Sequence, residues 1–572
     1  MRIAYSLMVK KTVLGLKLPD WLLFRPCVHA SGIVWERGWF RKDELIGVSQ
    51  RIARLNMIRF NYLINNQWVR GLYYFVNMFA PPRVVTGVET AEYSRYHVFK
   101  QSGVPVRLVS FQFSQYILNG CSRFGLSPAD VVNLYDYFCG IDYQTPVRAP
   151  AVAPRLFTAE TQEGLLTRYF RQDRLLRKVR RDRQGRIVSV YDYDDQRRSR
   201  SVSFYRPTGS LANTLWFSVE NGRLIHTHTT YQDQLGRGCL TAWYRNGDDH
   251  PSSLLLTDWK RQQTRSFTSE AALAGYFLDE LVRRDPAAVF IVDRAADVQP
   301  AIQHMTLTAP CFAFIHAVVA SKDQQVSGYY RPVADHFALW RGVITSTAEQ
   351  AEALQRRWPQ VQVLHANVSV LSDAQLKARV PAVAARSRHQ IVMLARVDPA
   401  KNIEAAIEIL QLVQENVPNA TLEIWGRGHI AAFGDYQTQL ERLIRSKGLT
   451  ASVHFNGYTD DPAAVLDQSR VLLMTSKGEG TGLVINEALA RGVPVVSYAF
   501  KYGPSEFIRD GENGYLVAAD DPQRAARCVV ELLLNDPVWV KRSRAARVRA
   551  RRFDAAHSWQ QWARVLTRIK NG

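Results

Sequence analysis

The sequence predicts an α/β protein with two doubly wound domains, the first of which is interrupted by an antiparallel β-meander. Three observations support this fold class. The chain has 572 residues, which is too long for one hydrophobic core. Apolar strands alternate with helical segments in two separate parts of the chain, as in parallel sheets covered by helices. Within the first of these parts, short alternating segments follow one another with turn signals between them.

The first α/β domain begins at residue 71. We expect a strand at 72–76, a loop at 80–87, a helix at 88–101 and a second strand at 106–111. This β-α-β order predicts a parallel sheet. The same pattern returns from residue 271 onward. Three further buried strands are expected there, at 289–292, 313–315 and 342–344.

The predicted meander covers residues 151–262 and is rich in arginine. Segments 186–191 and 223–228 alternate polar and apolar residues, and turn signals precede them at 182–185 and 220–222. Alternating segments separated by turn signals are typical of β-strands, so this pattern predicts an antiparallel meander. We interpret the segment as an insertion in the first domain.

The second α/β domain begins with the apolar strand 390–394, and helical segments follow at 403–416 and 436–447. Its later strands are expected at 421–425, 453–455, 470–474 and 494–497. The predicted organisation is an N-terminal extension without assigned chemistry (1–70), a first domain in two parts (71–150 and 263–375), the meander (151–262), the second domain (376–552) and a C-terminal helix (553–572).

The composition of the chain constrains its cellular location and its binding partners. The formal net charge is +21, which favours anionic partners such as nucleic acid, a phosphate polymer or an anionic membrane surface, although a basic solvated surface gives the same number. Lys17 and Asp20 interrupt the apolar stretch 12–24, so we expect no secretory signal, and no apolar run is long enough for a transmembrane helix. The six cysteines are scattered, which predicts free thiols in a cytoplasmic protein.

The strongest chemical signal is the segment 476–488, SKGEGTGLVINEA. Glu479 lies in its glycine-rich loop, and Glu487 follows in the predicted helix. Such a loop lets backbone N–H groups approach sugar hydroxyls and phosphates, and the helix N-terminus adds partial positive charge. A carboxylate inside the helix can accept hydrogen bonds from ribose hydroxyls. The alternative is a turn followed by a glutamate on the helix surface.

Four weaker signals also follow predicted strands of the second domain. Arg396 and Lys401 form a cation pair suited to a diphosphate, since arginine binds oxygens through a planar fork and lysine acts as a point charge. The other three signals are 425–428 (WGRG), 455–461 (FNGYTDD) and 501–506 (KYGPSE). Strand C-termini of a doubly wound sheet meet along one edge, so these signals predict one ligand crevice.

This ordered set resembles the donor-site pattern of family 4 of the GT-B glycosyltransferases. The likeness narrows to the wall teichoic acid α-glucosyltransferases, including those that act on poly(glycerol phosphate), and to the accessory-secretion O-glycosyltransferases of serine-rich adhesins. Both groups carry a β-rich insertion in the first domain. The segments that carry this narrower likeness are 73–77, 86–89, 91–93, 133–138 and 502–505, and the resemblance extends from residue 71 to the end.

The resemblance implies roles for individual residues. Glu487 would hold the ribose of UDP, Arg396 and Lys401 would neutralise the leaving diphosphate, and Glu479 and His316 would face the donor sugar. Further binding residues would be Thr86 and Gly87 at the phosphates, Gly426, Gly457 and Tyr458 around the nucleotide, and the backbone of Gly480, Thr481, Gly482 and Leu483 at the hexose.

Some of these assignments have alternatives. A core histidine with satisfied hydrogen bonds is the other interpretation of His316, and Asp293 serves either structure or acceptor binding. The family often has a second histidine soon after the first, whereas Ala317, Val318 and Val319 follow here.

The implied activity is retaining transfer of a hexose from a UDP-sugar, with glucose favoured over N-acetylglucosamine and with no metal or other cofactor. Poly(glycerol phosphate) is the favoured acceptor, because the net charge and Arg174, Arg177, Arg180, Arg181 and Arg183 suit a polyanion. The alternatives are a Ser/Thr-rich protein acceptor and, in another class, an inactive substrate-binding partner subunit. We expect peripheral contact with an anionic inner membrane face, homo-oligomer contacts through the meander, and no nucleic-acid binding, since no aromatic-basic RNA motif is present.

Overall fold

The computed structural model describes residues 71–79, 81, 86–147, 152–154, 156–245, 247–319, 326–428 and 435–571, together with the backbone of 24–29 and 32–37. The chain divides into two compact units, Met1–Val69 and Arg70–Gly572. In the first unit, strands β1 (Phe24–His29) and β2 (Gly32–Arg37) pair antiparallel. The rest of the predicted extension 1–70 lies outside the described residues. No helix among the described residues is long and apolar enough to cross a membrane.

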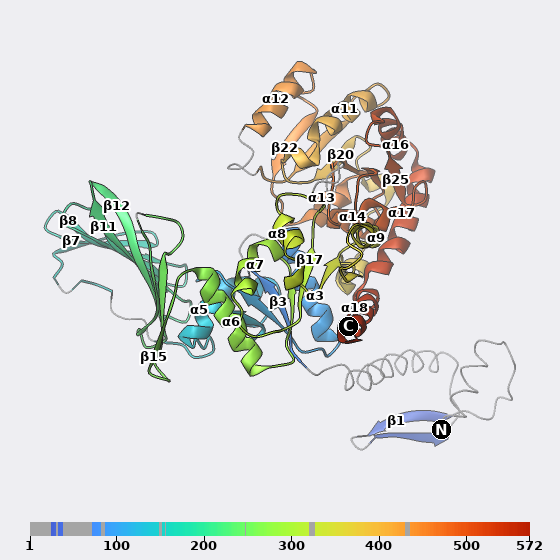
Figure 1. The fold of residues 1–572 in the computed structure, drawn as a ribbon. Coiled ribbons are helices and arrows are strands. Elements are labelled where there is room, and N and C mark those ends of the chain that lie inside the picture. The colour runs from blue at the N-terminus through green and yellow to red at the C-terminus, as the bar shows by residue number, and fades with distance from the viewer. Residues whose placement is uncertain are drawn as a thin grey trace. The chain divides into compact units, whose positions relative to one another are not determined.

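The first α/β domain is built on a parallel seven-stranded sheet in the order β19-β18-β17-β16-β3-β4-β5 (Figure 1). Strands β3 and β17 are buried along their whole length, because helices cover both faces of the sheet. The strands are β3 (Tyr73–Asn77), β4 (Val106–Ser110), β5 (Val131–Asn133), β16 (Val289–Val292), β17 (Cys311–Ile315), β18 (Gly342–Thr345) and β19 (Val363–His365). The helices are α3 (Gly87–Gln101), α4 (Ile117–Arg123), α5 (Leu134–Cys139), α6 (Glu270–Arg284), α7 (Ala295–Gln303), α8 (Arg331–Asp335) and α9 (Ala348–Arg357).

The insertion is a ten-stranded antiparallel sheet in which each strand pairs with the next along the chain. In Figure 1 it extends to the left of α5 and α6, and β15 lies beside α6. The strands are β6 (Ala159–Glu163), β7 (Leu166–Arg171), β8 (Arg174–Arg181), β9 (Ile187–Tyr193), β10 (Ser199–Tyr205), β11 (Leu211–Glu220), β12 (Arg223–Gln232), β13 (Gly238–Trp243), β14 (Ser253–Asp258) and β15 (Gln263–Phe267). The sheet therefore continues a few residues beyond the predicted end of the meander at residue 262.

The second α/β domain has a parallel six-stranded sheet in the order β22-β21-β20-β23-β24-β25. Its strands are β20 (Gln390–Leu394), β21 (Thr421–Trp425), β22 (Val453–Gly457), β23 (Val471–Met474), β24 (Val495–Tyr498) and β25 (Gly514–Val517). Its helices are α11 (Ile403–Gln414), α12 (Tyr436–Ser446), α13 (Pro462–Gln468), α14 (Leu483–Ala490), α15 (Pro504–Phe507), α16 (Pro522–Leu534) and α17 (Asp536–Ala550). Helix α10 (Asp373–Lys377) precedes the domain. The predicted fold class, two Rossmann-like domains with a meander in the first, is confirmed.

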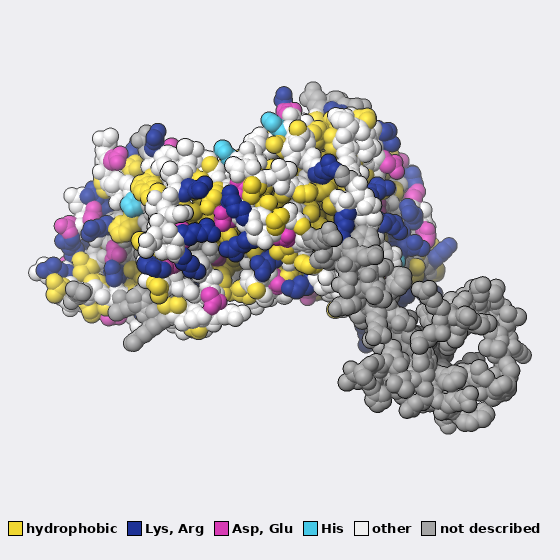
Figure 2. Space-filling view, turned by 60° about the horizontal axis from the view of Figure 1, so that its bottom comes forward, with side chains coloured by type: hydrophobic (Ala, Val, Ile, Leu, Met, Phe, Trp, Pro, Cys, Tyr) yellow, Lys and Arg dark blue, Asp and Glu magenta, His cyan; other side chains and the backbone are white. Residues whose placement is uncertain are grey.

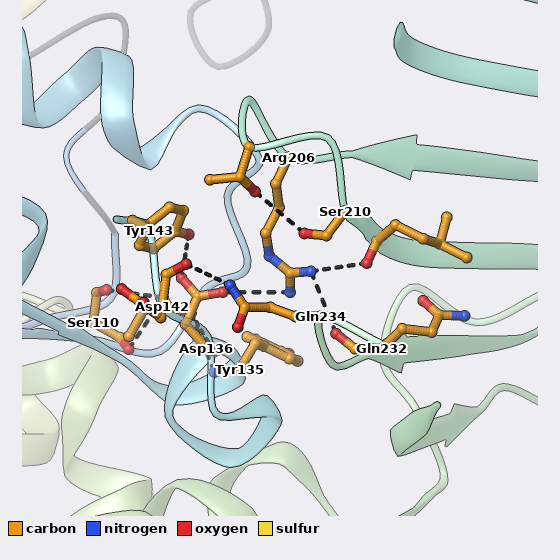
Figure 3. A network of polar contacts seen from close by, with 12 residues as sticks. Ser110, Tyr135, Asp136, Asp142, Tyr143, Arg206, Ser210, Gln232 and Gln234 are labelled. Atoms are coloured by element: carbon orange, nitrogen blue, oxygen red, sulfur yellow. Dashed lines mark hydrogen bonds and ion pairs between the residues drawn. The ribbon is translucent and has the colours of Figure 1, made fainter. Parts of the chain in front are cut away.

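A buried arginine anchors the insertion on the first domain. Arg206 follows β10, and Figure 3 shows its guanidinium pointing toward Asp136 on α5, 3.5 Å away. The same guanidinium donates to the carbonyl oxygens of Leu211 (2.8 Å) and Gln232 (3.3 Å). The Tyr143 hydroxyl donates to the second oxygen of Asp136 at 2.6 Å. A buried charge needs such partners, so these contacts fix the sheet against α5.

The C-terminal helix α18 (Ala555–Asn571) packs on the first domain rather than on the second, which precedes it in the chain. Its Trp562 is fully buried among core residues of the seven-stranded sheet and meets Phe99 edge-on, with ring centroids 5.2 Å apart. The two α/β domains are therefore joined twice, by the crossing before β20 and by the chain that leads into α18.

We predict that Trp562→Ala lowers the free energy of unfolding by about 3–5 kcal/mol, because truncation of a fully buried aromatic side chain leaves a cavity. Urea unfolding followed by circular dichroism measures the change. Trp243→Ala is the matched control, since Trp243 is 38% exposed on the insertion sheet. Equal destabilisation by the two substitutions would contradict a core role for α18.

Candidate functional site

The residues predicted for the donor site meet at the C-terminal edge of the six-stranded sheet. Arg396 and Lys401 follow β20, Gly426 follows β21, Gly457 ends β22, and Glu479 lies in the loop after β23. All neighbouring strands of this sheet are parallel, so these loops lie on the same edge. The structure thus gathers segments that are up to about eighty residues apart in the sequence.

Lys401 and Glu479 form an ion pair between the loops after β20 and β23. Their side chains are only 16% and 17% exposed, so the pair is shielded from bulk water. Ser476 Oγ donates to the same carboxylate oxygen at 2.9 Å. Thr475 Oγ1 donates to the carbonyl oxygens of Lys401 (3.0 Å) and Asn402 (2.9 Å). These bonds fix the two loops against each other and hold the lysine and the glutamate in the crevice.

Arg396 lies on the same loop as Lys401 but does not join this ion pair. Its side chain is 55% exposed and contacts Asp398 at 3.0 Å. Asp398 is buried and also accepts a hydrogen bond from the N–H of Ala400 at 2.9 Å, which begins the short 3-10 turn that carries Lys401. The Arg396 guanidinium is therefore held by Asp398 while more than half of its side chain stays exposed to solvent.

Glu487 lies in the second turn of α14, which begins immediately after Gly482. Among the described residues, no donor forms a hydrogen bond or an ion pair with its carboxylate. Burial raises the pKa of Glu487 to about 7. Glu487 is partly buried, and a carboxylate that loses part of its hydration without gaining a donor is less easily ionised. Hydroxyl groups of a ligand would supply the missing donors.

The glycine-rich loop after β23 touches the first domain. A methyl group added at Gly480 would lie 1.5 Å from the carbonyl oxygen of His316, which follows β17. Ser346 Oγ, after β18, donates to the carbonyl oxygen of Gly480 at 3.0 Å. A methyl group at Gly87 would lie 3.7 Å from the Leu483 side chain, so the start of α3 also faces this loop. The glycine-rich loop of the second domain therefore packs against the ends of β17 and β18 and faces the start of α3.

The imidazole of His316 is held by buried side chains. Its Nε2 lies 2.7 Å from Oδ1 of Asp293, and its ring stacks on Phe314. Asp293 also pairs with Arg95 of α3, whose side chain is fully buried. Burial alone would raise the pKa of Asp293, but Arg95 and His316 hold that pKa below its usual range. The backbone carbonyl of His316 faces Gly480 of the glycine-rich loop, while its side chain belongs to this buried network.

The buried network on α3 was not predicted from the sequence. Burial and the nearby Asp293 raise the pKa of Glu92 well above its usual range, and Asn77 Nδ2 donates to Glu92 at 2.7 Å. Glu89 binds Arg294 at 2.7 Å. A signal was present, because Glu89, Glu92 and Arg95 are three positions apart and so share one helix face. Charged residues on one face are more often solvated, which is why the spacing alone did not reveal them.

The remaining predicted residues have structural partners. Thr86 caps α3, and its N–H and hydroxyl both donate to Glu89. Residues 82–85 of the adjoining predicted loop lie outside the described residues. The N–H of Gly426 donates to the carbonyl oxygen of Gly457 at 2.8 Å, which joins two of the crevice loops. Tyr458 is 44% exposed, and the Arg427 guanidinium lies 5.3 Å from its ring centroid.

Thr481 and Gly482 complete the loop. Thr481 is buried, and a methyl group at Gly503 would lie 2.4 Å from its carbonyl oxygen. The loop after β24 therefore packs directly on the glycine-rich loop. Among the described residues, no group of three His, Cys, Asp or Glu side chains has a geometry that could hold a metal ion.

Residues 377–552 match the family model described as glycosyl transferases group 1. The chain is 23% identical over 451 residues to the poly(glycerol-phosphate) alpha-glucosyltransferase of Bacillus subtilis, a match that covers 77% of this chain and 65% of that enzyme. It is 21% identical over 468 residues to the poly(ribitol-phosphate) alpha-N-acetylglucosaminyltransferase of Staphylococcus aureus, which covers 79% of this chain and 90% of that enzyme.

The fold matches that of the pneumococcal O-GlcNAc transferase GtfA, whose crystal structure contains UDP and GlcNAc, with a TM-score of 0.72 at 17% identity over 88% of this chain and 100% of that chain. The fold is therefore GT-B, and the predicted resemblance to this group of glycosyltransferases is confirmed. The matched segment spans just under two thirds of the Bacillus subtilis enzyme.

We predict that Gly480→Ala reduces sugar transfer by about a hundredfold while the protein stays folded, because the new methyl group would displace the loop from the His316 carbonyl. Steady-state kinetics and circular dichroism measure the two effects. Gly328→Ala is the control, since nothing lies within 4 Å of the added carbon there. Unchanged kinetics in Gly480→Ala would show that the contact does not shape the site.

The resemblance implies that Glu487 holds a ribose. On that expectation we predict that binding of UDP-glucose strengthens as pH rises through about 7, by up to about tenfold per pH unit below that value, because the ionised carboxylate accepts hydrogen bonds from ribose hydroxyls more strongly than the neutral form. The UDP-glucose diphosphate stays ionised in this range. Titration calorimetry from pH 5.5 to 8.5 measures the affinity. Glu487→Gln should remove this dependence, and an equally steep dependence in that variant would exclude Glu487 as its source.

The folded-state pKa of Glu487 lies above the unfolded value, so the free protein should lose stability as pH rises from about 4.5 to 7. Glu487→Gln should reduce that loss.

Proposed function

We propose that this chain, whose residues 377–552 match the glycosyl transferases group 1 family, is a retaining hexosyltransferase that uses a UDP-sugar, with glucose favoured over N-acetylglucosamine. The observation that carries the proposal is the arrangement of one crevice. The Lys401–Glu479 ion pair lies at one edge of the second sheet, and on the same edge Glu487 has a carboxylate without a donor among the described residues. This arrangement suits a ligand with a diphosphate between two sugars.

In the proposed donor complex, Lys401 and Arg396 contact the diphosphate and Glu487 accepts hydrogen bonds from the ribose. Glu479 and the backbone N–H groups of 480–483 hold the hexose. The start of α14 adds partial positive charge beside the phosphates. Lys401 is paired with Glu479 in the free protein, so donor binding places the diphosphate next to a cation that is already oriented.

The proposed reaction proceeds on one face of the sugar. The bond between the anomeric carbon and the UDP oxygen breaks, and the acceptor oxygen forms the new bond on the same face. The acceptor proton moves to the leaving phosphate, so no side-chain base is needed. Lys401 and Arg396 stabilise the negative charge that develops on UDP, which lowers the barrier because these cations are already in place. The His316 carbonyl, beside Gly480, is an electron-rich group suited to a positively charged sugar.

For the acceptor we favour poly(glycerol phosphate). The net charge of +21 and the likeness to a glucosyltransferase named for that polymer support this choice. The likeness to an O-GlcNAc transferase keeps a Ser/Thr-rich protein acceptor as the second candidate. An inactive partner subunit is disfavoured, because Arg396, Lys401, Glu479 and Glu487 are all present at one sheet edge.

We predict that the purified protein releases UDP from UDP-glucose faster than the hydrolysis background when poly(glycerol phosphate) is added. Lys401→Ala should lower this rate by about 10²–10³-fold, as loss of a preoriented charge does in other enzymes. Lys377→Ala is the matched control, since its side chain is 71% exposed on α10. The rate should persist in EDTA, because we propose that two protein cations replace a metal ion.

Parallel reactions with UDP-N-acetylglucosamine and with a Ser/Thr-rich peptide separate the alternatives. Glycosylation of the peptide without glycosylation of the polymer would overturn the preferred acceptor. No transfer to any acceptor would favour the inactive partner subunit. Near-normal turnover by Lys401→Ala would refute the proposed role of that lysine.

A further inference from the structure

A second cavity lies where the insertion meets the first domain. It has a volume of about 370 Å³ and is lined by α5, α6, the turn before β13 and the β14–β15 hairpin. None of its lining residues belongs to the donor crevice. Figure 2 shows the molecule with the bottom of Figure 1 turned toward the viewer. On this face, Lys and Arg side chains gather among apolar ones.

The cavity lining carries a surplus of positive charge. Its three carboxylates already have arginine partners, in the pairs Asp233–Arg237 (2.8 Å), Asp258–Arg261 (3.7 Å) and Glu280–Arg283 (2.7 Å). By contrast, Lys260, Arg265 and Arg284 form no ion pair with any carboxylate in the described part of the chain. Three exposed cations therefore face one cavity without compensating charge, and an anionic ligand would neutralise them.

Two of these three cations, both arginines, lie on aromatic rings. The Arg265 guanidinium is 4.5 Å from the centroid of the Tyr276 ring on α6. The Arg284 guanidinium is 4.5 Å from the centroid of the Tyr137 ring on α5. Such stacking restricts the side chain and leaves the N–H groups at the edge of the guanidinium free. A phosphate oxygen pair fits that edge, because arginine binds phosphate through two parallel hydrogen bonds.

Contacts within the protein support the walls of the cavity. The Arg206–Asp136 contact holds the insertion on α5, next to the lining residues that follow Asp136. Trp259 donates its indole N–H to the carbonyl oxygen of Gly238 at 2.8 Å, while 46% of the side chain remains exposed. The rim therefore offers an apolar ring beside the cations, as suits a ligand in which phosphates alternate with carbon-rich units.

We propose that this cavity binds a phosphodiester segment of the acceptor polymer, away from the site of sugar transfer. That the ligand is the acceptor rests on the proposed function. That the cavity binds a polyol phosphate chain is independent of the proposed function. A bound segment would tether the polymer and raise the concentration of its other units at the donor crevice. Among the insertion arginines that suit a polyanion by sequence, Arg174 and Arg177 are already paired with Asp195 and Asp192.

The test is the binding of fluorescently labelled glycerol-phosphate oligomers to the full-length chain without UDP-sugar, followed by fluorescence polarisation. The Arg265→Ala/Arg284→Ala double variant should bind at least about tenfold more weakly, since it removes two charge-assisted contacts, and its affinity should depend less on salt. Arg200→Ala/Arg223→Ala is the matched control, because it removes the same charge from exposed positions of the same sheet outside the cavity. Thermal melting checks that both variants are folded.

The conservative variant Arg265→Lys/Arg284→Lys separates local contacts from overall charge. It keeps the charge but loses the planar fork, so its affinity should lie between those of the wild type and the alanine variant. Equal weakening in the alanine variant and in the control would overturn the proposal, because diffuse charge would then explain binding. Unchanged binding in the alanine variant, or tighter binding of an acidic peptide than of the oligomer, would also overturn it.

Kinetics distinguish this proposal from the proposed function. In the alanine variant, KM should rise about tenfold for a long polymer, while transfer to a single glycerol-phosphate unit stays unchanged. If no acceptor is glycosylated by the wild type but oligomer binding still depends on Arg265 and Arg284, the proposed function fails and the cavity assignment stands. Equal loss of transfer to long and short acceptors would contradict a tethering role.

Discussion

The contact between the Gly480 backbone and the carbonyl oxygen of His316 is the constraint on which the candidate site depends. It places the glycine-rich loop of the second domain directly on the end of β17 in the first domain, with no room for a side chain between them. The Ser346 hydroxyl donates to the same segment. Strand β17 is buried along its whole length, so the loop packs on the close-packed core of the first domain.

Buried charged side chains hold His316 at the end of β17. Arg95, fully buried on α3, pairs with Asp293, and Asp293 binds the imidazole. Buried ions require satisfied partners, so removing one member leaves another charge unpaired in the core. The guanidinium of Arg95 also lies 4.1 Å from the centroid of the Phe75 ring on β3. The crevice is therefore supported by a polar network that extends into the centre of the first sheet.

The elements that position the site were predictable from the sequence, whereas the contacts between distant segments were not. Continuous apolar runs such as 289–292 and 390–394 reveal buried parallel strands, and the ligand-binding edge follows from the strand order. The packing of Trp562 on the first domain and the burial of Arg95 depend on tertiary contacts. A single sequence does not distinguish a buried tryptophan or arginine from an exposed one. The pairing of Lys401 with Glu479 likewise needed the geometry of both loops.

Glu487 is a residue whose burial disfavours the ionised carboxylate in the free protein. Its carboxylate has no donor among the described residues, and burial raises its pKa to about 7. The free protein therefore keeps a partly buried carboxyl group whose ionised form is disfavoured, on α14 at the edge of the sheet. Functional sites often retain such costs because a ligand removes them. A ligand that supplies hydroxyl donors would recover this energy on binding, so the same burial that weakens the empty crevice favours a sugar over a simple anion.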